Sequence, residues 1–360
     1  MEYQPFIGAC ISHHTSQLSL VTNNSPSRIF QVSIFIFCLI CLASCRQKSD
    51  SHKPTIGLLM ETLKEERWQH DRDFFVAKAS SLGCNVEVAA CNNDDNLQIA
   101  QAENMLAKGV DILVVVPHNG DICATIVNKA HAQGVRVIAY DRLIRNCDLD
   151  LYISFDNVRV GEMQAAYIVE RAPAGNYILM GGAKTDNNAL LFRKGQTNVL
   201  QPYIESGKIK IIMDQWATDW QAGEAMKHVE NALTKTTDIQ AVVASNDATA
   251  AGCIQALTEK GLAGKVLVSG QDADIGGCRR VVAGTQSMTI YKPIQPLAET
   301  AVEAALQMIN NTIVIKAARV INNGKIDVPG ILLDPVAVDK DNMRETVIAS
   351  GYQKSEDVYK

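Results

Sequence analysis

The sequence predicts an α/β fold made of two Rossmann-like lobes, each built on a parallel sheet. From Pro54 onward, short apolar runs typical of buried strands alternate with longer amphipathic helical patterns. Continuous apolar strands separated by such helices are typical of parallel sheets that helices cover on both faces. The chain has 360 residues and 47% apolar content, so it is long enough for two ordinary domains.

The first lobe begins with three strand–helix pairs and a closing strand. Gly83, Gly109 and Gly134 fall just past the ends of the three helical patterns, where a left-handed residue is usual. The pattern predicts strands over 55–60, 85–90, 112–116 and 135–140, and helices over 66–82, 97–108 and 122–133.

A second series of elements starts after Asp156-Asn157 and predicts the second lobe. Its strands are expected over 176–180, 210–213, 241–245, 266–269 and 287–291, and its helices near 189–206, 222–234, 249–260 and 275–283. A helix over 294–310 follows, and the irregular segment 313–339 most simply crosses back between the lobes. We therefore expect a first lobe of residues 54–159 plus 293–325 and a second lobe of residues 160–292 plus 326–360, joined by a multi-strand hinge.

The first 45 residues have the pattern of an export signal. Phe30 to Ala43 is almost wholly apolar, follows Arg28, and is too short to span a bilayer comfortably. The run ends at Leu42-Ala43-Ser44-Cys45, which is similar to a bacterial lipobox, so we expect lipidation of Cys45 and a linker over 46–53. The alternatives are an uncleaved anchor or a chance cysteine. The stretch before Phe30 is long for such a signal, which leaves the start of translation open.

Composition and motifs argue against several function classes. A net charge of -5 is unsuited to a nucleic-acid surface. No nucleophile elbow, zinc-protease helix, phosphate loop or dinucleotide fingerprint is present, so neither an enzyme, a cofactor nor a metal is expected. Six cysteines beyond the signal lack zinc or redox spacing, and their pairing is left open, although buried thiols are favoured; they are Cys84, Cys91, Cys123, Cys147, Cys253 and Cys278.

Polar clusters at the ends of five predicted strands indicate a ligand site. Ligands of open α/β sheets bind outside the carboxyl ends of the strands. Here those ends carry carboxylates, amides, Arg and Lys, with aromatic residues nearby. A sugar hydroxyl both donates and accepts hydrogen bonds, so this mixture suits a neutral polyhydroxylated ligand better than a phosphate or a metal.

Several runs resemble the D-xylose-binding group of the type I periplasmic binding proteins, the two-lobed Venus-flytrap proteins of ABC sugar importers. They include Glu66–Gln69, Tyr140–Arg142, Asp186–Ala189, Ala241–Ala250 and Ser269–Asp274, and the similarity extends from about Thr55 to Ile348. The resemblance implies a monomer that closes around one monosaccharide, most closely D-xylose, and delivers it to an ABC permease in the membrane. It implies a location in the periplasm or, with the lipid anchor at Cys45, on the outer face of a membrane. A sugar-sensing input for a histidine kinase or chemoreceptor is the alternative.

The resemblance also implies a set of ligand contacts in this chain. Taken alone, some of these residues have ordinary structural explanations: Asp186 and Asn188 are typical of turns and helix caps, and Trp68 of a core. The case rests on the whole set at the strand ends: Arg67, Trp68, Asp141, Arg142, Asp186, Asn188, Arg193, Trp220, Asn246, Asp272 and Lys292.

Overall fold

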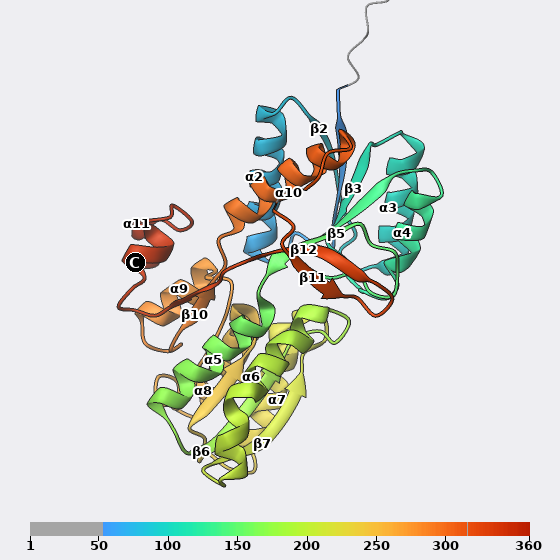
Figure 1. The fold of residues 1–360 in the computed structure, drawn as a ribbon. Helices are drawn as coiled ribbons and strands as arrows, with labels where there is room; N and C mark the ends of the chain where they lie inside the picture. The colour runs from blue at the N-terminus through green and yellow to red at the C-terminus, as the bar shows by residue number, and fades with distance from the viewer. Residues whose placement is uncertain (1–52, 315) are drawn as a thin grey trace, which may run out of the picture. The chain divides into compact units, whose positions relative to one another are not determined.

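Two α/β lobes make up the part of the chain that the computed structural model describes, residues 53–314 and 316–360 (Figure 1). The expected signal and lipobox over 1–45, with Cys45, lie outside the described residues, as does the expected linker up to His52. Within the described part, no helix is both long enough and apolar enough to cross a membrane.

The first lobe is built on a sheet of seven strands in the order β11-β12-β5-β4-β3-β1-β2. All neighbouring pairs are parallel except β11 with β12. The interior strand β3 is wholly apolar and fully buried, as expected for a strand that helices cover on both faces. The strands are β1 (Thr55–Met60), β2 (Asn85–Ala90), β3 (Ile112–Val115), β4 (Arg136–Tyr140), β5 (Leu151–Phe155), β11 (Arg319–Asn322) and β12 (Asp327–Leu333).

Four helices cover the two faces of this sheet. One core packs α2 (Glu66–Ser81) and α10 (Ile294–Ile309) against one face, through residues such as Phe75 and Leu297. A second core packs α3 (Asp95–Ala107) and α4 (Ala124–His131) against the other face, through residues such as Met105 and Ile126. Residues of β1 and β3 alternate between the two cores, because successive side chains of a strand point to opposite faces of the sheet.

The second lobe has a parallel sheet in the order β7-β6-β8-β9. Its strands are β6 (Gly175–Gly181), β7 (Ile209–Trp216), β8 (Ala241–Ala244) and β9 (Leu267–Val268). The helices α5 (Asn157–Arg171) and α6 (Asn187–Glu205) contribute to one core, and α7 (Ala222–Leu233) and α8 (Asp247–Glu259) to the other. A 3₁₀ turn over Thr218–Trp220 precedes α7.

Close packing of α5 on α6 depends on two glycines. A Cβ added at Gly161 would lie 2.0 Å from the carbonyl oxygen of Phe192, and one at Gly195 would lie 2.0 Å from that of Val158. Only glycine lets the two backbones approach this closely. The contact holds the first half of α6, which carries Phe192, in a fixed position.

The remaining elements complete the second lobe beside α9 (Ile275–Val282). The strands β10 (Thr289–Tyr291) and β13 (Val336–Val338) form an antiparallel pair. A π-type turn over Arg344–Ile348 and the short helix α11 (Ser355–Val358) pack with α9 in one apolar cluster.

The backbone crosses between the lobes three times. The crossings follow β5, β10 and β12. The assignment of residues 326–360 to the second lobe is wrong for β12, because Gly330–Leu333 pair in parallel with Tyr152–Phe155 of the first sheet. The last crossing therefore falls between Leu333 and Val336, and only the segment beyond it belongs with β10.

Candidate functional site

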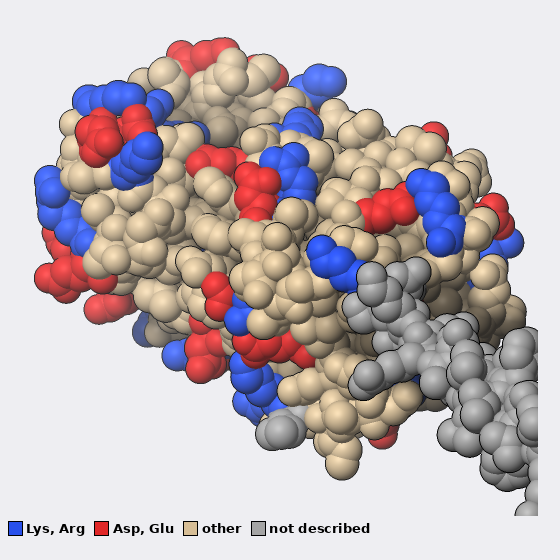
Figure 2. Space-filling model, turned by 90° about the horizontal axis from the view of Figure 1, so that it is seen from above, with Lys and Arg blue, Asp and Glu red and all other residues tan. Residues whose placement is uncertain are grey.

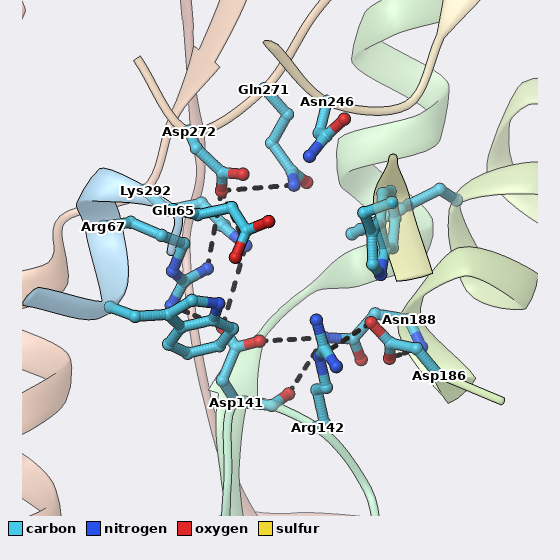
Figure 3. A pocket seen from close by; sticks show the side chains of 13 residues that line it. Glu65, Arg67, Asp141, Arg142, Asp186, Asn188, Asn246, Gln271, Asp272 and Lys292 are labelled. Carbon is cyan, nitrogen blue, oxygen red and sulfur yellow. Dashed lines mark hydrogen bonds and ion pairs between the residues drawn. The ribbon is translucent and has the colours of Figure 1, made fainter. Parts of the chain in front are cut away.

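One pocket lies where the two lobes meet, at the carboxyl ends of strands from both sheets (Figure 3). The cavity that its lining side chains leave open is small, with a volume of about 30 Å³. Residues that follow β1 and β4 line it from the first lobe, and residues that follow β6, β7, β8, β9 and β10 line it from the second. The lining residues are Glu65, Arg67, Trp68, Asp141, Arg142, Asp186, Asn188, Phe192, Trp220, Asn246, Gln271, Asp272 and Lys292.

Arg67 stands at the start of α2 and joins three carboxylates. Its Nε donates to Asp71 at 3.1 Å, and its terminal nitrogens donate to Asp141 at 2.9 Å and to Asp272 at 3.4 Å. Asp272 belongs to the second lobe, so this guanidinium bridges the two lobes. The guanidinium carbon also lies 4.1 Å from the ring centroid of Trp68, which fixes the ring against the pocket wall.

Arg142 forms a second bridge between the lobes. Its Nε lies 2.8 Å from a carboxylate oxygen of Asp186, and its Nη1 pairs with Glu61 of the first lobe. Burial lowers the pKa of Arg142 even though Asp186 opposes the shift. Burial likewise raises the pKa of Asp186, against the attraction of Arg142. Each partner thus stabilises the charged form that burial disfavours in the other.

Lys292 completes the charged network where β10 leads into α10. Only 2% of its surface is exposed, and its Nζ lies 3.2 Å from Asp272 and 3.6 Å from Asp141. Burial alone would raise the pKa of Asp272, but the attraction of Lys292 and Arg67 outweighs it and lowers that pKa. Asp272 is therefore held as a carboxylate, an acceptor for hydroxyl donors.

Two pocket residues are also helix caps. Asp186 accepts from the backbone N–H of Asn188 at 2.8 Å, and Asn246 accepts from that of Thr249 at 2.8 Å. The Asn188 side chain donates to Asp141 Oδ2 at 3.1 Å and accepts from Asn157 at 2.9 Å. Each of these two residues therefore caps a helix and also lines the pocket, because its helix begins at the carboxyl edge of the sheet.

Three pocket residues hold the backbone in a left-handed conformation that non-glycine residues rarely adopt. The φ angles are 59° at Asp141, 58° at Trp220 and 95° at Asp272. Such conformations cost about 1–3 kcal/mol each and cluster at functional sites. Each of these turns directs a polar or aromatic side chain into the pocket.

Three buried polar atoms of the pocket have no hydrogen-bond partner among the residues that the structure describes. They are Glu65 Oε2, Gln271 Oε1 and Trp220 Nε1. Buried polar groups are nearly always paired, so unpaired ones in a pocket indicate a polar ligand. One carboxylate, one amide oxygen and one indole N–H together suit a ligand that both donates and accepts.

The structure brings together ten of the eleven residues that the sequence predicts. Arg193 does not line the pocket, and its expected ligand contact stays a prediction. It follows Phe192 on α6 and therefore points about a quarter-turn away. Its Nη1 pairs with Asp214, its Nε donates to Gln196 at 3.1 Å, and its guanidinium lies 4.6 Å from the Trp216 centroid.

Sequence reasoning missed three lining residues, namely Glu65, Phe192 and Gln271. Gln271 directly precedes Asp272 at a predicted strand end, which was a usable signal. Phe192 lies one turn after Asn188 on the same helix and so faces the same way. Glu65 carried no such signal, because an acidic residue just before a helix is ordinary.

The described part of the chain does not indicate a metal centre. Residues 53–314 and 316–360 contain no group of three or more His, Cys, Asp or Glu side chains that could hold a metal ion. On the face shown in Figure 2, acidic and basic side chains of these residues are interspersed, and no extended basic patch is seen there.

Comparison with known proteins identifies the family. The family described as "Periplasmic binding protein domain" matches residues 56–313. The chain belongs to the periplasmic binding proteins. This periplasmic binding protein is 54% identical to the D-xylose-binding periplasmic protein of Haemophilus influenzae over 84% of the chain and 92% of the relative. The protein of the same name from Escherichia coli is 52% identical, with the same coverage.

A solved structure confirms the fold of this periplasmic binding protein. The carbohydrate transporter solute-binding protein of Chloroflexus aurantiacus, in complex with D-glucose, superimposes with a TM-score of 0.81 at 33% identity. The match covers 85% of this chain and 98% of that protein. The predicted class, two α/β lobes with parallel sheets, is therefore correct.

Proposed function

We propose that this periplasmic binding protein captures a monosaccharide, D-xylose, by closure of its two lobes and delivers it as a monomer to an ABC permease. The observation that carries the proposal is the convergence of polar side chains from both lobes on one pocket with three unpaired buried polar atoms. The names of the two relatives above 50% identity support D-xylose as the ligand.

The charges of the pocket support a neutral ligand. Arg67, Arg142 and Lys292 each pair with carboxylates, so none is left over to neutralise a phosphate. Fixed carboxylates and cations can instead accept from and donate to the hydroxyls of one sugar. Aromatic side chains add apolar surface for the C–H faces of the ring, namely Trp68, Phe192 and Trp220.

Closure of the lobes would couple ligand capture to delivery. Contacts from both lobes surround the pocket, so a bound sugar stabilises the closed arrangement. A ligand shifts such an equilibrium only through its preference for the closed form. A permease that recognises the closed form would then accept the loaded protein, and hinge opening would release the sugar.

The relatives are solute-binding proteins, and the pocket supports the same role here in place of catalysis. A glycosidase would need one carboxyl group that stays protonated near neutral pH to act as a general acid. Asp272 is unsuited to this task, because Lys292 and Arg67 lower its pKa. Burial raises the pKa of Glu65 and Asp186 in the same pocket, so the proposal of binding over catalysis rests on the relatives and not on these carboxyl groups.

The location follows from the relatives and from the signal pattern. The relatives are named periplasmic proteins, which supports a place outside the cytoplasm. We further propose that a lipid on Cys45 tethers the chain to the outer face of a membrane. Replacing the thiol, as in Cys45→Ser, should then move the protein from the membrane fraction to the soluble fraction. Unchanged fractionation would rule out the lipid anchor.

Isothermal titration tests the ligand. We expect the protein that begins after Cys45 to bind D-xylose with a dissociation constant of about 1 μM, near -8 kcal/mol. Ribose, arabinose, glucose and galactose should bind more weakly. Heat from another sugar only would reject D-xylose but keep the class, and no heat from any sugar would reject sugar binding.

A cellular assay separates the transporter from the sensor. Deletion of the protein should abolish D-xylose uptake if it serves a permease. Retained uptake together with a lost transcriptional or chemotactic response to D-xylose would support a sensor partner instead.

A further inference from the structure

Glu65 occupies a pocket position that neither the sequence motifs nor the relatives' names assign. It directly precedes α2 at the N-cap position, where an acidic side chain normally accepts from a backbone N–H of the first turn. Its side chain makes no such bond. The carboxylate instead projects into the pocket beside Asp272 and Lys292, as Figure 3 shows.

The carboxylate of Glu65 lacks the partners that every other acidic group of the pocket has. Its side chain is 14% exposed, and its Oε2 is buried without a hydrogen-bond partner in the described structure. Among residues 53–314 and 316–360, its ion pair is a 3.9 Å contact from Oε1 to Lys64, whose own side chain is 60% exposed. An exposed contact of this kind contributes little.

The cations of the pocket are already committed to other carboxylates. Arg67 pairs with Asp71, Asp141 and Asp272, and Lys292 pairs with Asp141 and Asp272. Arg142 pairs with Asp186 and Glu61. Glu65 is thus a carboxylate in excess, and a hydroxyl of the ligand is suited to donate to its Oε2.

We propose that Glu65 is a further ligand-contacting and specificity-determining residue, which accepts a hydrogen bond from one hydroxyl of the bound sugar. The inference rests on the proposed sugar-binding function and deepens it. A sugar that lacks this hydroxyl would leave a buried carboxylate unpaired and would bind more weakly.

Burial has a second consequence for Glu65. It raises the pKa of the carboxyl group, with a smaller contribution from Asp272, against its own backbone N–H, Lys64 and Arg67. Because the ionised form is the better acceptor, affinity that depends on Glu65 is present above its pKa and is lost as the pH falls through it. The other charged groups that share the pocket are Asp141, Arg142, Asp186 and Lys292.

A thermodynamic cycle between Glu65→Ala and a set of monodeoxy analogues of the bound sugar tests the proposal. Glu65→Ala should weaken binding of the parent sugar about tenfold, and Glu65→Gln, which keeps an acceptor, about threefold. At one ring position the effects of removing the hydroxyl and removing Glu65 should be non-additive by about tenfold. That position identifies the hydroxyl that Glu65 contacts.

The pH profile supplies a readout that a purely structural role would not change. Between pH 7 and pH 5 the wild-type protein should lose more affinity than Glu65→Gln. Asp73→Asn is the matched control, because Asp73 lies on the same helix with a side chain that is 63% exposed outside the pocket. The loss of sugar affinity of this variant between pH 7 and pH 5 should match that of the wild type.

The possible outcomes separate the two proposals. If the wild type binds no sugar, the proposed function fails and Glu65 fails with it. If the wild type and Asp73→Asn bind while Asp272→Ala does not, the site stands. In that case, additive effects at every ring position, or equal pH profiles for the wild type and Glu65→Gln, would overturn the role of Glu65 alone.

Discussion

Replacing Asp272 by alanine is the sharpest test of the site. This carboxylate lies in the second lobe, yet it contacts Arg67 of the first lobe at 3.4 Å and Lys292 at the crossing at 3.2 Å. It also accepts from the side chain of Gln271 at 3.2 Å. Its removal therefore affects both the proposed sugar contact and the contact between the lobes.

The expected loss of affinity follows from the charge on Asp272. Hydrogen bonds to charged groups contribute about 1.5–3 kcal/mol each. At 1.4 kcal/mol per tenfold change, one lost contact to the sugar weakens binding about 10- to 150-fold. The lowered pKa of Asp272 means that this contact is available throughout the neutral range.

The folded protein should tolerate the same change. Breaking a buried ion pair costs about 3–5 kcal/mol where it leaves an uncompensated charge. Here Arg67 and Lys292 both keep Asp141, at 2.9 Å and 3.6 Å. We therefore expect Asp272→Ala to destabilise the ligand-free protein by less than about 3 kcal/mol, a smaller effect than the full penalty.

Titration calorimetry and thermal unfolding separate these two effects. Asp214→Ala is a suitable control, since Asp214 also pairs with an arginine but is 48% exposed and lies outside the pocket. The control should bind D-xylose as the wild type does. An Asp272→Ala protein that is folded and binds within threefold of the wild type would refute the placement of Asp272 at the ligand.

Three further predictions follow from the geometry. Trp220→Ala should weaken sugar binding by about tenfold or more with the fold retained, measured by calorimetry and circular dichroism, because Trp220 is a pocket wall that packs edge-on against Phe192. His118 Nε2 lies 3.3 Å from Asp219 and joins the lobes. His118→Gln and Asp219→Asn should therefore each weaken sugar binding about threefold, and the double variant should weaken it no further. Additive losses of affinity in the double variant would contradict this link. A reducing agent should leave the melting temperature of the protein that begins after Cys45 unchanged, because the six cysteines of the described part are free and buried; a drop would reveal a disulfide.

The sequence was sufficient to predict most of the fold because its strands are of the buried parallel type. Ile112–Val116 and Ala241–Ala244 are uninterrupted apolar runs, and the structure has β3 and β8 at these places. It was not sufficient for β5 or α5, which the predicted elements omit. The helix α5 buries polar residues such as Gln164 and Asn157 beside the site, and these hide its apolar face.

The sequence was sufficient to predict polar pocket residues that directly follow a strand. It was less sufficient for residues whose place depends on how a helix is rotated. Asp141 and Lys292 directly follow strands, so their place at the carboxyl edge of a sheet could be predicted. Whether Phe192 or Arg193 enters the pocket depends on the rotation of α6, which its packing on α5 through Gly161 and Gly195 sets. That contact joins two helices through backbone atoms and leaves no pattern in side-chain polarity.

The pocket residues divide into two classes that should act on binding in different ways. Arg67–Asp272 and Arg142–Asp186 already bridge the lobes without any ligand atom. Paired carboxylates such as Asp272 keep acceptor capacity for a sugar hydroxyl, and only contacts that favour the closed form shift the equilibrium. The unpaired atoms of Glu65, Gln271 and Trp220 add contacts that only the ligand satisfies. Changes at these three should therefore alter sugar affinity alone, whereas changes at Asp272 or Arg142 should also alter how readily the empty lobes close.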